Sequence, residues 1–113
     1  MNEQRQQDRI PCDIILNKVE GGHTNVCRAE NVSLGWMKLA RVDEGHRPQG
    51  QAVQLQFVLP GDWEPIWVTG EKVYDDQGNV GVRFTNISYT GFVRLREWLR
   101  EQAICQNFPE FST

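Results

Sequence analysis

Two arginines near the N-terminus, Arg5 and Arg9, are the first side chains of this sequence whose type and spacing suggest ligand binding. They lie in a polar segment without apolar periodicity, so no burial pattern accounts for them. A guanidinium group is a planar fork of donors that matches phosphate oxygens and the O6/N7 edge of guanine. The pair therefore suits a purine nucleotide, and the alternative is ordinary solvated charge.

A second group of polar side chains occurs in residues 30–36, with the sequence ENVSLGW. Asn31 and Ser33 share one side of an extended chain, so an amide and a hydroxyl can face the same ligand. Gly35 allows close approach of the backbone. The alternative is an ordinary turn, in which the Asn and Ser side chains bond to local backbone groups.

Residues typical of catalysis or metal binding are scarce. The odd set of Cys12, Cys27 and Cys105 suggests neither a disulfide framework nor a paired zinc knuckle, so we expect reduced thiols. His23 and His46 are isolated in turn-like stretches, which leaves no metal-ligand spacing and no Cys–His or Ser–His pair. We therefore expect a protein that is not an enzyme and that has no metal or cofactor.

Length and charge limit the remaining possibilities. A chain of 113 residues holds one domain, and 12 basic against 15 acidic side chains give a net charge of -3. This balance argues against a protein that coats nucleic acid or an anionic membrane, so an anionic ligand would need a local cluster. No apolar run approaches the roughly 20 residues of a membrane span, and residues 1–5 do not begin a signal peptide, so we expect a cytoplasmic protein.

The elements that must position these groups are mostly strands. Alternating apolar residues predict strands at residues 10–16, 26–32, 36–42, 53–59, 66–74 and 80–85, with turns at 20–25 and 75–79 and a loop at 43–50. A longer period then predicts one amphipathic helix, with Phe92, Leu95, Leu99 and Ala103 on one stripe. The pattern indicates an all-β fold, a six-stranded antiparallel barrel with one C-terminal α-helix.

The same pattern divides the chain into three parts. Residues 1–9 form an N-terminal arm that contains the arginine pair, and residues 10–104 form the barrel and its helix. Residues 105–113 form a tail in which Phe108 and Phe111 could dock on the barrel or on a partner.

Together, the Arg-x-x-x-Arg motif followed by Ile-Pro and the Asn-x-Ser motif at a strand corner resemble the PilZ domain family. The resemblance covers residues 5–104 and includes residues 81–84, GVRF, and the closing helix. PilZ domains are bacterial six-stranded barrels that bind cyclic di-GMP, and the resemblance implies that ligand here.

The resemblance also implies a role for each motif residue. Arg5 and Arg9 would grip guanine and phosphate, while Asn31 and Ser33 would hold a guanine edge and the sugar-phosphate. We expect the ligand to draw the arm onto this corner and so to change the surface that an unknown protein partner contacts.

One position departs from the family pattern. The glycine that ends the corner motif in the family is Trp36 in this sequence, and Gly35 occupies the preceding position. An indole at this point either obstructs the ligand or offers a face on which guanine stacks. Asp8 also places a negative charge within the arm.

Two other functions remain open from the sequence. The first is a PilZ-fold adaptor for proteins that binds cyclic di-GMP weakly or not at all, as in motility or type IV pilus function, with Trp63, Trp67, Phe108 and Phe111 as its contact surface. The second is an oligonucleotide-binding barrel on which single strands stack, and the net acidity counts against it. Its platforms would be Trp36, Trp67 and Tyr74.

Overall fold

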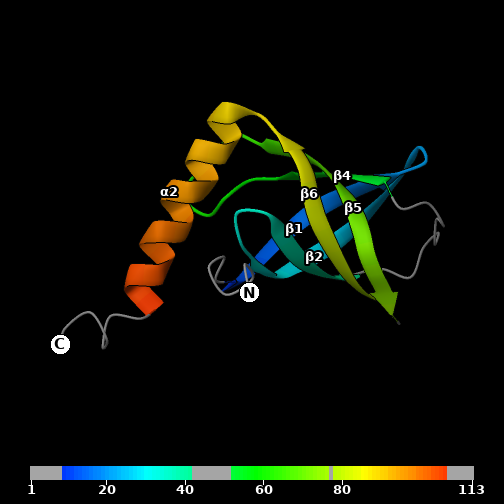
Figure 1. Cartoon of the computed structure of the whole chain (residues 1–113), viewed down its shortest axis with the longest axis horizontal. Coiled ribbons are helices and arrows are strands. Elements are labelled where there is room, and N and C mark those ends of the chain that lie inside the picture. Colours follow the sequence, from blue (N-terminus) through cyan, green and yellow to red (C-terminus); the bar gives the residue numbers. More distant parts are fainter. Residues whose placement is uncertain (1–8, 42–51, 77, 107–113) are drawn as a thin grey trace.

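The computed structural model describes residues 9–41, 52–76 and 78–106. The strands are β1 (Ile10–Glu20), β2 (His23–Val32), β3 (Trp36–Arg41), β4 (Ala52–Phe57), β5 (Ile66–Asp76) and β6 (Asn79–Ile87), and the helix is α2 (Tyr89–Gln106). All strand pairs are antiparallel, and the order β1-β2-β3-β6-β5-β4 closes into a barrel through pairing of β4 with β1 (Figure 1). The predicted six-stranded barrel with a C-terminal helix is confirmed.

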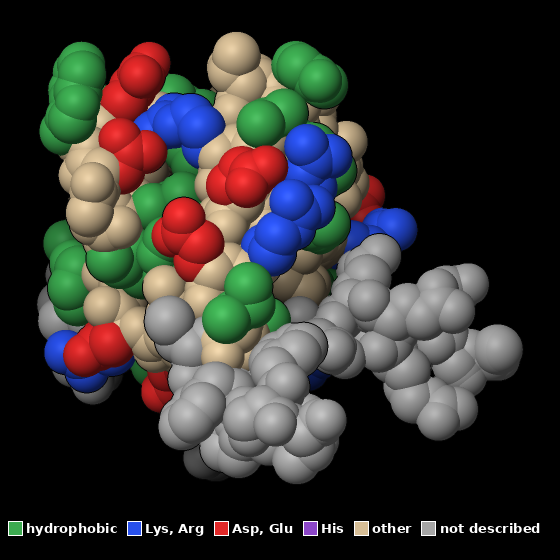
Figure 2. Space-filling view, turned by 90° about the vertical axis from the view of Figure 1, so that its left-hand side faces the viewer, with side chains coloured by type: hydrophobic (Ala, Val, Ile, Leu, Met, Phe, Trp, Pro, Cys, Tyr) green, Lys and Arg blue, Asp and Glu red, His purple; other side chains and the backbone are tan. Residues whose placement is uncertain are grey.

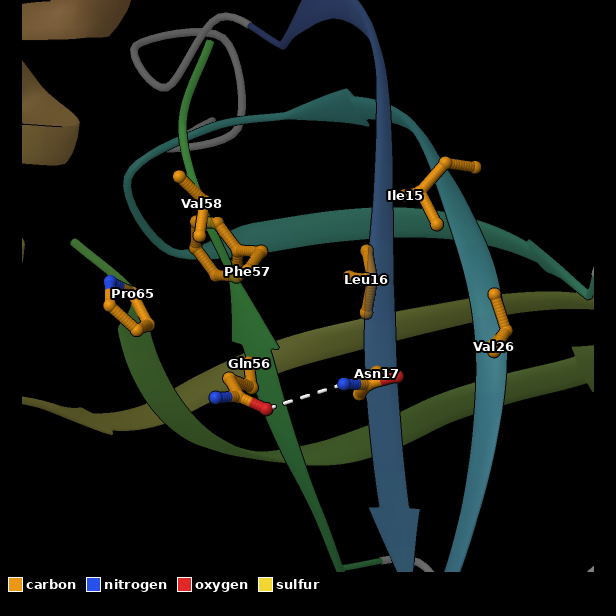
Figure 3. Close-up of a pocket in the computed structure, with 8 residues that line it drawn as sticks. All are labelled: Ile15, Leu16, Asn17, Val26, Gln56, Phe57, Val58 and Pro65. Atoms are coloured by element: carbon orange, nitrogen blue, oxygen red, sulfur yellow. Dashed lines mark hydrogen bonds between the residues drawn. The ribbon is translucent and has the colours of Figure 1, made fainter. Parts of the chain in front are cut away.

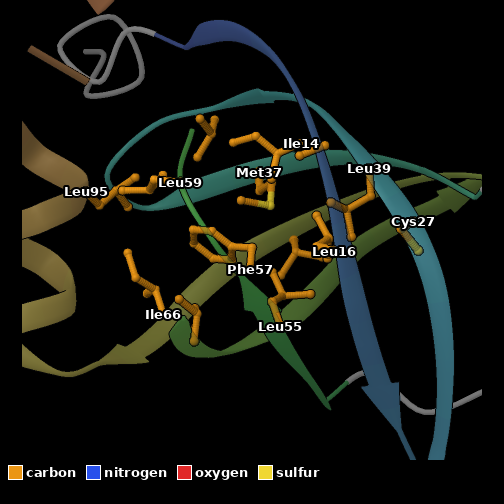
Figure 4. Close-up of a cluster of buried hydrophobic side chains, with 14 of the residues drawn as sticks. Ile14, Leu16, Cys27, Met37, Leu39, Leu55, Phe57, Leu59, Ile66 and Leu95 are labelled. Carbon is orange, nitrogen blue, oxygen red and sulfur yellow. The ribbon is translucent and has the colours of Figure 1, made fainter. Parts of the chain in front are cut away.

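Strand alternation fills the barrel with apolar side chains. Ile14 and Leu16 of β1, Met37 of β3 and Leu55 and Phe57 of β4 are almost fully buried and point into one cluster (Figure 4). Burial of each such side chain is worth about 1.5–3 kcal/mol, so this cluster is the main support of the strands that carry the candidate site.

Helix α2 covers one end of the barrel. Leu95 lies close to Leu59 in this region, and both are buried (Figure 4). Arg94 also donates from Nε to Asp62 Oδ2 at 3.1 Å, which joins the helix to the segment between β4 and β5. This bond and the backbone N–H of Trp63 hold the pKa of Asp62 below its usual range. Among the described segments, no helix combines the length and apolar character needed to cross a bilayer.

The first hairpin is longer than the sequence pattern predicts. Its turn consists of Gly21 and Gly22, with φ angles of 54° and 83°, whereas a turn across residues 20–25 was expected. Two successive positive φ angles are the backbone of a tight hairpin turn, which glycine adopts without strain. Glu20 and His23 consequently belong to the strands. The predicted loop at 43–50, residues 1–8 of the arm, and Phe108 and Phe111 lie outside the described residues.

The longer first strand places charged side chains inside the barrel. Lys18 and Glu20 continue the inward face of Leu16 and are 0% and 2% exposed. Lys18 Nζ donates a hydrogen bond to Glu20 Oε1 at 2.6 Å. The other carboxylate oxygen, Glu20 Oε2, lies 2.7 Å from Nζ of Lys72 on β5. Asp75 is a further partner of Lys72 at 3.4 Å. Along β1, the interior thus changes from an apolar cluster at Ile14 and Leu16 to a buried ionic cluster at Lys18 and Glu20.

The thiol of Cys12 illustrates how burial controls reactivity in this fold. Its Sγ lies 3.3 Å from the backbone oxygen of Ala29, and burial together with the charge of Asp13 raises its pKa to about 11. At pH 7 only about one thiol in ten thousand is therefore the reactive thiolate.

We expect iodoacetamide to modify Cys12 slowly in the folded protein, with a rate that rises about tenfold per pH unit up to about pH 10. Peptide mapping by mass spectrometry, with protein unfolded in urea as the control, measures this rate at each pH. A rate that levels off near pH 8.5 would contradict the raised pKa.

Candidate functional site

Strand pairing fixes where the arm leaves the barrel. Ile10 pairs with Val32 and Pro11 pairs with Asn31, so the start of β1 lies beside the end of β2. Arg9 directly precedes β1 and is exposed. The register therefore brings Arg9, the last residue of the arm, to the corner between β2 and β3, although the two segments are far apart in the sequence.

Local hydrogen bonds shape this corner. Ser33 N–H donates to the Trp36 backbone oxygen at 2.8 Å, and Gly35 N–H donates to Ser33 Oγ at 3.3 Å. The Gly35 oxygen accepts from Phe84 N–H at 2.9 Å, which ties the corner to β6. Ser33 is only 1% exposed, so in this structure its hydroxyl holds the turn together rather than facing solvent.

Asn31 offers an unused acceptor. A register shift between Ala29 and Asn31 interrupts the pairing of β2 with β3, as expected for a β-bulge that redirects a side chain. The Oδ1 atom of Asn31 is buried, and it has no hydrogen-bond partner among the described residues. An unsatisfied buried acceptor costs free energy, about 1–3 kcal/mol, which a donor from a ligand would recover.

Arg9 lies on the indole of Trp36. The guanidinium carbon is 3.9 Å from the ring centroid, a distance at which a cation is attracted by the ring quadrupole. Within the described part of the chain, no ion pair involves Arg9. Its donor groups are thus held at the corner by an aromatic face and are not neutralised by a carboxylate there.

A second aromatic ring lies beside Trp36. The Tyr74 and Trp36 ring centroids are 5.9 Å apart with planes tilted by 43°. Both rings pass over Gly81 of β6, where an added Cβ would collide with Tyr74 and would lie 2.7 Å from Trp36 Cζ2. Gly81 is therefore required as a glycine by the rings above it.

Charges near the corner are of both signs. Lys38 pairs with Glu30 at 3.3 Å, and Arg83, which is opposite Trp36 in the β3–β6 register, pairs with Glu71. On the face in Figure 2, basic and acidic side chains are likewise interspersed, and no continuous basic surface covers its described residues. Residues 9–41, 52–76 and 78–106 contain no group of three His, Cys, Asp or Glu that could hold a metal ion.

A separate hollow lies on the barrel wall where β1 and β4 meet. Its volume is about 300 Å³, and two of its lining residues are joined by a hydrogen bond in which Asn17 Nδ2 donates to Gln56 Oε1 at 3.3 Å (Figure 3). Its other lining residues are Ile15, Leu16, Val26, Phe57, Val58 and Pro65. Trp67, paired with Gln56 in the sheet, is 53% exposed, and Trp63 is 85% exposed. Both tryptophans are therefore accessible, as the adaptor alternative requires, although tryptophans that flank a strand are more often part of the core.

The structure thus brings five of the six predicted site residues to one corner, and four of them, Arg9, Asn31, Gly35 and Trp36, are not fully buried. Ser33 belongs to the same corner but is buried, and Arg5 lies outside the described residues. Tyr74 was expected beside Trp36 only as a stacking platform for single strands, and Gly81 was not expected at this corner. The signal for Gly81 was present, because a glycine inside a strand often marks close approach of another group.

Comparison with known proteins agrees with this architecture. The family model described as "PilZ domain" matches residues 3–101. A search of curated proteins found no match. Among solved structures, the Bacillus subtilis inhibitor of motility MotI/DgrA has a TM-score of 0.70 and 16% identity, over 89% of this chain and 52% of that chain. This chain therefore spans about half the length of that protein.

Two other solved structures are isolated PilZ domains. The PilZ domain of CeSA from a cellulose-synthesizing bacterium has a TM-score of 0.65 and 18% identity, over 82% of this chain and 98% of that one. The PilZ domain of YcgR from Escherichia coli, solved with c-di-GMP, has a TM-score of 0.64 and 19% identity, over 98% of this chain and 100% of that one. With the family model matched over most of its length, this chain belongs to the PilZ domain family.

Proposed function

We propose that the protein is a cytoplasmic cyclic di-GMP receptor and adaptor that catalyses no reaction. The ligand binds at the corner between β2 and β3, and the arm closes over it. The observation that carries this proposal is the position of Arg9, whose guanidinium lies over Trp36 at the corner where the buried Oδ1 of Asn31 has no hydrogen-bond partner among the described residues.

The available groups are complementary to a guanine nucleotide. Guanine presents acceptors at O6 and N7 and a donor at N2, so Arg9 can donate to one edge while Asn31 Oδ1 accepts from another. Arg5 would add a second fork for phosphate. Gly35 and the turn held by Ser33 would let backbone approach the sugar-phosphate.

The position of Arg9 also bears on the two roles considered for Trp36. A planar cation already lies on the indole, so a planar base can reach the same face. This supports Trp36 as a stacking surface instead of an obstruction. The E. coli YcgR domain solved with c-di-GMP supports the choice of ligand, since it shares the fold over nearly the whole chain.

Binding would act as a switch through the arm. Fixing the backbone of each arm residue costs roughly 1–2 kcal/mol, so the arm becomes ordered only when ligand contacts offset that cost. The ordered arm would then present a new surface to a protein partner.

Isothermal titration calorimetry of the protein with cyclic di-GMP tests the proposal, with GMP as the control ligand. We expect micromolar affinity, equivalent to about -8 kcal/mol, for cyclic di-GMP and much weaker binding of GMP, which offers half the contacts. Absence of heat well above micromolar concentrations would contradict the receptor function.

A second candidate function is a protein adaptor that does not need the nucleotide. The exposed Trp67 and the apolar hollow between β1 and β4 favour it, because contact surfaces are enriched in tryptophan. In that case the calorimetric titration gives no heat, and Trp67→Ala weakens association with a motility or pilus partner.

A further inference from the structure

Beside the predicted motif residues, an aromatic surface is assembled from three strands. Trp36 comes from β3, Tyr74 from β5, and Gly81 of β6 lies beneath both rings. None of the three is needed by the apolar core, since Trp36 and Tyr74 lie on the outer side of the barrel. Tyr74 is 39% exposed, which leaves much of its ring open.

An irregularity in β5 explains how Tyr74 reaches this place. Lys72 pairs with Val82 and Tyr74 pairs with Gly81, so Val73 is an extra residue between two successive pairs. Without this β-bulge, Lys72 and Tyr74 would point to the same side of the sheet. With it, Lys72 points into the barrel toward Glu20, while Tyr74 points outward onto Gly81. Bulges commonly redirect a side chain next to a binding site.

Besides the β-bulge at Val73, the absence of a side chain at Gly81 is the second feature that makes this surface possible. With any Cβ at position 81, the two rings would have to lift away from the sheet, because the added atom would collide with both. The rings instead lie side by side, with their centroids 5.9 Å apart. Arg9 covers the indole in the structure, which demonstrates that this face accepts a flat group carrying donors.

We infer that Trp36 and Tyr74 form a two-ring platform on which one guanine base of the ligand stacks, with Tyr74 as a binding residue outside the arm and corner motifs. The base takes the place of Arg9 on the indole, and the Arg9 guanidinium donates to the edge of the base. This inference rests on the proposed cyclic di-GMP function and identifies an additional contact for it.

The test compares the affinity of four proteins for cyclic di-GMP: wild type, Tyr74→Leu, Tyr74→Phe and Tyr89→Leu. Stacking of a base on one aromatic ring corresponds to roughly a 5- to 150-fold change in affinity. We expect Tyr74→Leu to weaken binding about tenfold or more, whereas Tyr74→Phe retains the ring and binds within about twofold of wild type. Tyr89, 79% exposed at the start of α2, is the matched control and should have no effect.

A spectroscopic measurement separates stacking from a change in fold. In ligand-saturated wild type, the guanine H8 resonance should move upfield because of ring currents, and this shift should decrease in Tyr74→Leu. Equal affinities of Tyr74→Leu and wild type would overturn the platform while leaving the receptor function intact. Equal losses in Tyr74→Leu and Tyr74→Phe would assign the effect to the hydroxyl and also overturn it. Wild type that fails to bind would overturn the receptor function and the platform together.

Discussion

Replacing both arm arginines, Arg5→Ala with Arg9→Ala, is expected to abolish measurable cyclic di-GMP binding. Each charge-assisted hydrogen bond contributes about 1.5–3 kcal/mol net, so the loss of one from each side chain lowers affinity by about 10²- to 10⁴-fold. A ligand with a micromolar dissociation constant would then bind with a dissociation constant of about 0.1–10 mM. Calorimetry measures the change.

Two controls show whether this loss is specific to the guanidinium forks. Arg9→Lys keeps the positive charge but removes the planar pair of donors. It should therefore keep little of the affinity that the Arg9 guanidinium provides. Arg28→Ala removes an exposed arginine that pairs with Asp13 at 2.9 Å on another part of β1 and β2, and it should bind normally. Normal binding by the double variant at Arg5 and Arg9 would show that the arm does not contribute to the binding site.

The second large effect concerns stability. Replacing Glu20 with Gln leaves Lys18 and Lys72 inside the barrel without the carboxylate that each contacts within 2.7 Å. Breaking a buried ion pair from one side costs about 3–5 kcal/mol, a large part of the stability of a domain of this size. Urea denaturation should show this loss in the free energy of unfolding, with an unchanged m-value.

The matched control is Glu71→Gln, which removes a carboxylate from the exposed pair with Arg83 and should cost less than about 1 kcal/mol. Combining Lys18→Met with Glu20→Gln should recover part of the stability, because fewer uncompensated charges then remain buried. Equal stability of Glu20→Gln and Glu71→Gln would show that the buried cluster is not an essential part of the barrel.

The barrel could be predicted from sequence because its strands are amphipathic. Alternation such as Val53, Leu55 and Phe57 has one physical explanation, a strand with one buried face, and the structure agrees. The buried ionic cluster was missed although its residues follow the same alternation. Lys18 and Glu20 lie on the same side of the strand as Leu16, but the predicted strand ends at residue 16 and the predicted turn begins at Glu20.

The candidate site could be predicted only where local motifs reveal it. Asn31 and Trp36 are close in sequence, so their shared corner followed from spacing alone. The contact of Tyr74 with Trp36 depends on a bulge in β5 and on the register of three strands, and no local pattern encodes either. The same holds for the buried state of Ser33, which results from the turn geometry around Gly35.

The most direct test of the central claim is an amide and indole ¹H–¹⁵N NMR titration of the assigned protein with cyclic di-GMP. We predict that the largest shifts occur at Asn31, Gly35 and the indole N–H of Trp36, together with new ordered signals from the arm. Shifts confined to Trp67 and the hollow between β1 and β4, or no shifts at saturating ligand, would contradict the account.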